Sequence, residues 1–145
     1  MYKHILIPTD GSDLADKAVR HGIALAKTIG ARVTVMMAST AVPELAAQSA
    51  ILPSDMVEFR RRREEYAAKI FAAVLEEAQA AGVPCGTRHV EQDHPYQAII
   101  DTAQSEECDL VVMASHGRRG VAAVVLGSET VKVLTHSTVP VLVYR

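Results

Sequence analysis

The sequence predicts an α/β fold: a single domain over residues 1–145, with one doubly wound, five-stranded parallel sheet and helices on both faces. Five short apolar runs alternate with four segments of helical period, which is the pattern of a parallel sheet. Two of the runs, 4–9 and 110–114, are almost continuously apolar, as in strands covered on both sides. A chain of 145 residues is long enough to bury a core of its own.

The first strand and helix are marked by their ends. The strand is expected over His4–Thr9 and should stop near Pro8, whose nitrogen cannot donate to a sheet. Asp10–Ser12 follows as a tight turn, and either its last residue or Asp13 is suited to cap a helix. Gly30 is expected to end that helix.

The second strand is expected over residues 32–38, and a long helix over residues 54–81. Residues 39–53 between them have no period and include two prolines, which predicts a loop. Four consecutive arginines, Arg60–Arg63, could bind an anion. Glutamates flank them at helical spacing, so the favoured interpretation is a solvated helix face.

The rest of the chain supplies three strands and two helices. Residues 85–90 alternate apolar and polar side chains, which suits a strand at a sheet edge. The others are a helix from Pro95 to Ala103, a strand over 110–114, a helix over 128–136 and a last strand over Val139–Tyr144.

The order of the strands predicts where a ligand would bind. If the winding runs outward from the first strand to the third and returns through the fourth and fifth, the order is 3-2-1-4-5. Ligands of such sheets bind outside the carboxyl ends of the strands, where the winding reverses. The turns at this point are Pro8–Ser12 and Ala114–Gly117, the most polar and glycine-punctuated turns of the chain. Together they predict a functional crevice.

A glycine-rich loop follows the fourth strand. Residues 113–128 contain three glycines and two arginines and lead into a helix. Glycine lets backbone amides approach an anion, and the first turn of a helix leaves amides unpaired at the positive end of its dipole. The loop therefore predicts a phosphate site. Alternatively, the loop is only a strand-to-helix connection that needs flexible residues. The local pattern does not decide between a phosphate site and such a connection.

Several classes of function are not supported. The chain has no Walker A motif, no Gly-x-Gly-x-x-Gly after the first strand and no clustered carboxylates of a receiver domain. Its six histidines and two cysteines show neither a catalytic pairing nor metal-ligand spacing, and His116 beside the glycine loop is interpreted as a binding or structural residue. The formal net charge of −2 favours neither nucleic acid nor a membrane as a partner.

The location of the protein is expected to be cytoplasmic. No apolar run approaches the ~20 residues of a membrane span. The first apolar run is too short for a signal peptide, and the two cysteines are ordinary for a reducing compartment.

Taken together, these motifs resemble the universal stress protein family along the whole chain. The opening Lys3–Ser12 and the closing Val139–Val143 are similar to that family. Its ATP-binding branch carries the loop pattern Gly-x2-Gly-x9-Gly-(Ser/Thr), which falls here on Ala114, Gly117, Gly127 and Ser128. The resemblance implies a Rossmann-like fold of the adenine nucleotide alpha hydrolase type. Ala114 departs from the pattern: with a positive φ it would be strained by ~1–2 kcal/mol, and otherwise it only adds a methyl group.

The resemblance also implies the ligand, which is ATP together with Mg²⁺. Adenine and its sugar would lie against Pro8, Thr9, Asp10 and Ala38. The ribose and phosphates would lie over Met113 and Ala114. The phosphate chain would be wrapped by Gly117, Gly127, Ser128, Glu129 and Thr130. Glu129 is unfavourable beside a polyphosphate unless its side chain points away or Mg²⁺ intervenes, and Arg118 could offset its charge.

The favoured functional hypothesis is a cytoplasmic, ATP-binding regulatory protein of the stress response that acts as a homodimer. The last strand, Val139–Tyr144, is an apolar sheet edge through which two identical copies could pair. The alternative is a dimeric interaction module of the same fold that binds no nucleotide. An enzyme, at most a slow ATPase, is the least favoured, because the sequence shows no dedicated base and no acidic metal pair. The sequence does not identify a protein partner.

Overall fold

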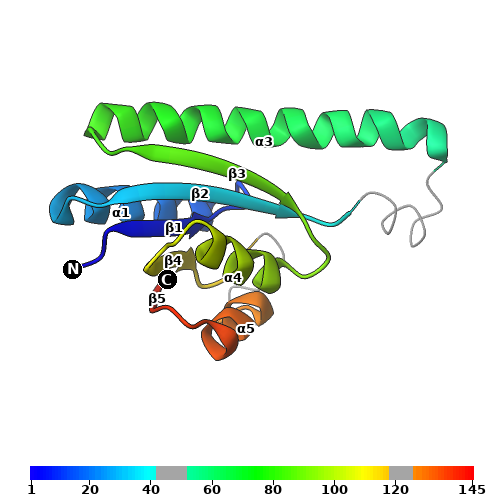
Figure 1. Ribbon diagram of the computed structural model, residues 1–145. Helices are drawn as coiled ribbons and strands as arrows, with labels where there is room; N and C mark the ends of the chain where they lie inside the picture. The colour runs from blue at the N-terminus through cyan, green and yellow to red at the C-terminus, as the bar shows by residue number, and fades with distance from the viewer. Residues whose placement is uncertain (42–51, 118–125) are drawn as a thin grey trace.

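The sheet has the predicted topology. The computed structural model describes residues 1–41, 52–117 and 126–145. Its five parallel strands lie in the order β3-β2-β1-β4-β5 (Figure 1). The bounds are β1 (His4–Pro8), β2 (Arg32–Ser39), β3 (Cys85–Glu91), β4 (Leu110–Ala114) and β5 (Val141–Tyr144).

Helices cover both faces of this sheet. On one face, α1 (Asp13–Ile29) and α3 (Pro53–Ala81) pack against the strands through side chains such as Ile23 and Phe71. On the other face lie α4 (Pro95–Ser105) and α5 (Ser128–His136), which form a second core with β1 and β4 (Figure 1). The strand β1 is buried from both sides, which is why its apolar run has no polar interruption.

The bounds of β4 and α5 are as predicted, and the ends of the other elements differ from the prediction by at most two residues. Ser12 caps α1, as predicted, and accepts a hydrogen bond from the Ala15 amide at 3.3 Å. The strand β5 begins at Val141 rather than Val139. Pro140 has no amide, so only its carbonyl joins the sheet, where it accepts from the Val111 amide at 2.9 Å. Most of the predicted loop, residues 42–51, lies outside the described residues.

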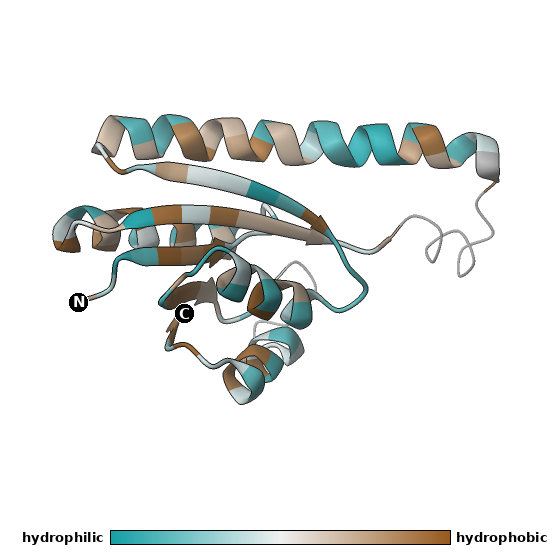
Figure 2. Ribbon diagram, viewed as in Figure 1, coloured by the Kyte–Doolittle hydropathy of each residue, from teal (hydrophilic) through white to brown (hydrophobic). Residues whose placement is uncertain are grey.

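The long helix α3 is anchored by its carboxyl-terminal half, where Ala67, Phe71, Val74 and Ala78 are buried. The arginine run lies within a hydrophilic stretch in the amino-terminal half of the helix (Figure 2). Arg61 and Arg62 pair with Glu58 on the exposed surface, as a solvated face predicts. Arg63 differs, because its side chain is only 17% exposed and donates to the Thr40 carbonyl at 2.6 Å. It ties α3 to the end of β2.

Among the described residues, no helix combines the length and the apolar character that a membrane crossing would need.

A buried histidine lies at the start of β1. His4 is 3% exposed, and its Nε2 lies 2.8 Å from the Thr34 hydroxyl of β2. The other ring nitrogen, Nδ1, is buried without a hydrogen-bond partner in the described part of the chain. Burial, and after it the charge of Arg32, lowers the pKa of His4 below its ordinary value of 6.5. The folded protein therefore favours the neutral ring.

This burial predicts a loss of stability in mild acid. Below pH 6.5 the unfolded chain binds a proton at His4 that the folded chain resists, so the free energy of unfolding falls as the pH decreases. The loss stops once the pH passes the lowered pKa of the folded state. Urea denaturation between about pH 7.5 and about pH 5.5 measures it. His4→Gln should flatten part of this dependence, and an unchanged slope would contradict the prediction.

Candidate ligand-binding site

A cavity of about 580 Å³ opens at the carboxyl ends of β1 and β4. Eleven of the twelve residues predicted from the sequence line it, and they come from β1, β2, β4, the adjoining turns and α5: Pro8, Thr9, Asp10, Ala38, Met113, Ala114, Gly117, Gly127, Ser128, Glu129 and Thr130. The twelfth, Arg118, lies outside the described residues. The structure therefore brings together the segments that the strand order predicted to meet.

Seven further residues line the cavity and were not predicted as site residues. They are Ala15, Met36, Thr40, Asp93, Pro95, Ile99 and His116. The sequence carried signals for two of them, since His116 adjoins the glycine loop and Pro95 begins the helix that covers this edge of the sheet. The remaining five reach the cavity through strand register and helix packing, which no local motif indicates.

The turn after β1 is held by hydrogen bonds within itself and from α3. The Ser12 amide donates to Asp10 Oδ1 at 2.9 Å, and the Gly11 amide donates to the Thr9 hydroxyl at 3.2 Å. Gly11 has a φ of +78°, which glycine adopts without strain. From α3, the Tyr66 hydroxyl donates to the Asp10 carbonyl at 3.1 Å. The Asp10 carboxylate thus has a defined position at the cavity.

The turn after β4 meets this carboxylate directly. A Cβ atom at Gly117 would lie 2.5 Å from Asp10 Oδ2, much closer than a carbon and an oxygen can approach. The φ of Gly117 is not positive, so a side chain here would meet the Asp10 carboxylate but would not strain the backbone. The two polar turns are therefore in contact with one another.

The helix α5 begins at the cavity with a glycine as its N-cap. Its N-cap is Gly127, and Ser128 is the first helical residue, so Ser128 is not the cap. The Gly127 amide donates to the Ser115 carbonyl at 2.6 Å, which fixes the start of the helix beside β4. The first amides of a helix have no intrahelical acceptor, and no side chain among residues 1–41, 52–117 and 126–145 caps those of α5. The cavity thus has an arrangement that suits an anion.

The hydroxyl group of Thr130 bonds to the backbone at the end of β4. Thr130 is 2% exposed, and its hydroxyl lies within hydrogen-bond distance of the carbonyls of Ala114, at 3.1 Å, and Ser115, at 3.0 Å. The single hydroxyl proton is therefore used to fasten α5 to the end of β4. Thr130 therefore borders the cavity, but its hydroxyl donates to the backbone and not into the cavity.

The charges that line the cavity are mainly negative. Asp10, Asp93 and Glu129 contribute carboxylates, and the described lining residues include no lysine or arginine. The carboxylate of Glu129 accepts from the Tyr96 amide of α4 at 2.9 Å and pairs with Lys132 at 3.3 Å. The amino-terminal ends of α1, α4 and α5 also reach the cavity, and the partial positive charge of these helix ends has the opposite sign.

A serine–histidine contact occurs elsewhere, although the sequence showed no such pattern. Ser39 Oγ lies 2.9 Å from His89 Nε2 across β2 and β3. Burial, and after it the charge of Arg63, lowers the pKa of His89. Within the described residues no carboxylate hydrogen-bonds to the second ring nitrogen, so the pair lacks the group that orients a catalytic base.

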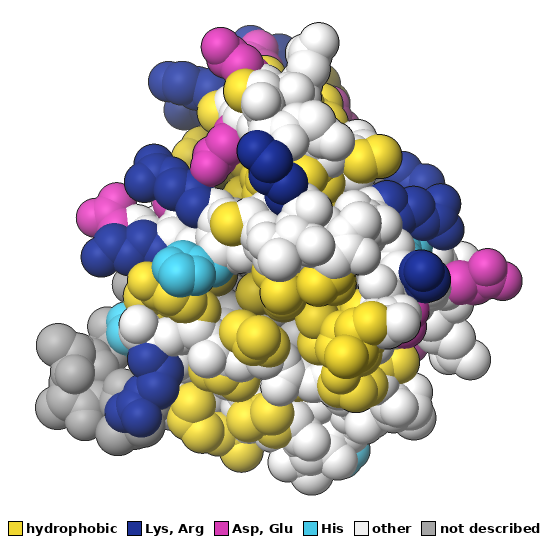
Figure 3. Space-filling view, turned by 90° about the vertical axis from the view of Figure 1, so that its left-hand side faces the viewer, with side chains coloured by type: hydrophobic (Ala, Val, Ile, Leu, Met, Phe, Trp, Pro, Cys, Tyr) yellow, Lys and Arg dark blue, Asp and Glu magenta, His cyan; other side chains and the backbone are white. Residues whose placement is uncertain are grey.

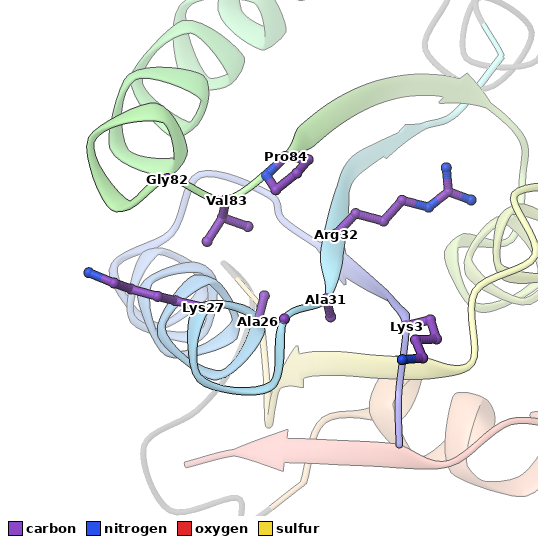
Figure 4. A pocket seen from close by; sticks show the side chains of 9 residues that line it. Lys3, Ala26, Lys27, Ala31, Arg32, Gly82, Val83 and Pro84 are labelled. Carbon is purple, nitrogen blue, oxygen red and sulfur yellow. The ribbon is translucent and has the colours of Figure 1, made fainter.

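A second hollow, of about 450 Å³, lies at the opposite end of the sheet. Lys3, Lys27 and Arg32 border it, but Figure 4 shows Lys27 pointing away from the other two. Cationic side chains that diverge do not converge on one anion. The cavity at β1 and β4 is therefore the better candidate for a ligand site.

The comparisons with known proteins agree with this architecture. The sequence model described as the Universal stress protein family matches residues 1–145. The chain belongs to this family. A universal stress protein of Thermus aquaticus is 35% identical over 145 residues, which cover all of both chains.

Solved structures of this family and fold are also similar. Protein MJ0577 of Methanocaldococcus jannaschii superposes with a TM-score of 0.84 at 27% identity, covering 99% of this chain and 96% of that one. A universal stress protein in complex with cAMP has a TM-score of 0.68 at 24% identity, covering 99% and 97%. At that identity the second likeness shows the fold alone.

Ala114, the departure from the loop pattern of the ATP-binding branch, fits without strain. It lies in β4 and is 9% exposed. Among the described non-glycine residues only Glu107 has a positive φ, so the φ of Ala114 is negative. Alanine therefore adds a methyl group at this position and no backbone strain.

The contact between the two turns predicts the effect of a single methyl group. Gly117→Ala should displace the Asp10 carboxylate and so shift the amide NMR signals of Gly11 and Ser12. The matched control is Gly86→Ala in β3, where an added Cβ meets nothing within 4 Å. Unshifted Gly11 and Ser12 signals in the Gly117 variant would show that the turns are not in contact.

Proposed function

We propose that this universal stress protein binds an adenine nucleotide, with ATP and Mg²⁺ as the favoured ligand, and that it is a cytoplasmic regulatory protein of the stress response. The observation that carries the proposal is the uncapped start of α5, which opens into the same cavity as the Asp10 turn. A nucleotide joins a planar base to an anion. One end of the cavity offers apolar surface and hydrogen-bonding groups for a base, and the other end suits an anion. The volume of the cavity is large enough for such a ligand.

The base and sugar are assigned to the β1 side of the cavity. Pro8, Ala38 and Met113 supply apolar surface there, and Asp10 supplies a fixed hydrogen-bond acceptor for the exocyclic amine or the sugar hydroxyls. The phosphates are assigned to the amides from Ser128 onward and to the Ser128 hydroxyl. In support, a protein of the same fold has been solved with cAMP, an adenine nucleotide.

The alternative is a module of the same fold that binds no nucleotide. The reason to consider it was Ala114 in place of glycine. The unstrained backbone at Ala114 removes one argument for that alternative, because the loop needs no rearrangement to accept alanine.

Calorimetry with MgATP tests the proposal. We expect an affinity in the micromolar range, about 8 kcal/mol of binding free energy. Asp10→Ala should weaken binding and reduce the preference for adenine. Gly127→Val should abolish binding, because a side chain there would press on the His116 backbone, 3.2 Å from a Cβ, and move α5. Ala114→Gly should bind equally well or more tightly.

Circular dichroism would verify that each variant is folded. No heat of binding for the native protein, with clear binding by Ala114→Gly, would instead support the module without nucleotide.

We also propose that the protein forms a homodimer through β5. This strand lies at the edge of the sheet, and its Leu142 is 42% exposed. On the adjoining helix α5, Val131 and Leu134 are 45% and 42% exposed. Hydrophobic side chains gather on the lower half of the face in Figure 3, at the height where β5 and α5 lie in Figure 1. An unpaired apolar edge suits antiparallel pairing with a second copy.

The backbone orientation of β5 identifies the residue that tests this interface. The Pro140 carbonyl accepts from the Val111 amide of β4, and the Tyr144 carbonyl accepts from the Ser115 amide just after β4. Every second residue of β5 is therefore turned toward β4, and the amides of Val141 and Val143 face outward. Val143→Pro should therefore remove an outward donor and yield monomers in sedimentation velocity, while Val143→Ala should remain dimeric. Proline at Leu142 would instead break the pairing with β4. A dimeric Val143→Pro variant would refute this interface.

A further inference from the structure

The Glu129 carboxylate is fixed at the border of the cavity. Its Oε2 accepts from the Tyr96 amide in the first turn of α4 at 2.9 Å, and its Oε1 lies 3.3 Å from Lys132 Nζ. Lys132 in turn lies over the Tyr96 ring, with Nζ 5.6 Å from the ring centroid. Both carboxylate oxygens are thus engaged, and the charge is held in one place although the side chain is 38% exposed.

This place lies between the amino-terminal turns of α4 and α5. Glu129 occupies an amide of α4, where a phosphate group could otherwise bind, and leaves the amides of α5 open. It follows Ser128 directly, so its negative charge adjoins the position assigned to the phosphates. The other carboxylates of the lining, Asp10 and Asp93, have the same sign, and the described lining provides no cationic side chain.

We propose that Glu129 is a specificity-determining residue that disfavours ligands with uncompensated negative charge. The inference rests on the proposed nucleotide site. Metal-free ATP, with its longer and more highly charged phosphate chain, is repelled by the fixed carboxylate. Nucleoside monophosphates carry less charge, and in MgATP the cation offsets it. The site therefore binds AMP or MgATP in preference to metal-free ATP.

The test is calorimetry with three probes: ATP in EDTA, ATP with excess Mg²⁺, and AMP. Glu129→Gln keeps an oxygen that can accept from the Tyr96 amide but removes the charge. We expect this variant to lower the ratio of the dissociation constants of metal-free ATP and AMP by about tenfold. The control is Glu76→Gln. Glu76 is an exposed residue of α3 on the opposite face of the sheet, so its substitution removes one negative charge far from the cavity and should leave the ratio unchanged.

The outcomes separate this inference from the proposed function. If the native protein binds AMP and MgATP but Glu129→Gln leaves the ratio unchanged, the role of Glu129 is overturned and the nucleotide site stands. An equal change in Glu76→Gln would likewise overturn it, because net charge would then be the cause. If neither nucleotide binds to the native protein or to Glu129→Gln, the proposed function fails, and the inference fails with it.

Discussion

The candidate site depends on one close contact, between the turns that follow the two central strands. Gly117 lies so near the Asp10 carboxylate that a side chain at 117 would overlap it. Asp10 is held in turn by the Ser12 amide and, through its carbonyl, by Tyr66 of α3. Because β1 and β4 are adjacent, the sheet sets the distance between the turns, and the missing side chain at 117 lets them close on each other. The cavity is thus positioned by the most buried part of the fold.

At the start of α5, the proposed phosphate end of the cavity, two residues have separate roles. A serine or threonine at position 127 could cap α5 with its side chain, whereas Gly127 has no side chain to do so. The helix is held in place from further along, by the Thr130 hydroxyl on the carbonyls of Ala114 and Ser115. Thr130 therefore holds the start of the helix in place, and Gly127 adds no side chain that would compete for its amides.

The fold could be predicted from the sequence because each element carried its own signal. The unbroken apolar run of β1 indicated a central strand, and the strand order then followed from the winding rule, which brought the two turns together. The use of individual side-chain atoms could not be predicted in this way. The sequence around Thr130 does not indicate whether its hydroxyl contacts a ligand or donates to the backbone. Likewise, Asp93 and Ile99 reach the cavity only because α4 packs where it does.

The candidate site and the proposed dimer edge are one strand apart. Met113 and Ala114 at the cavity are paired in register with Val143 and Tyr144 of β5, and the Ser115 amide donates to the Tyr144 carbonyl at 2.8 Å. The same short strand thus holds the turn after β4 on one side and presents its outward amides on the other. Any coupling between ligand and assembly would need no long path through the core. It would also be reciprocal, so that a ligand that favours the dimer is bound more tightly by the dimer, by the same free energy.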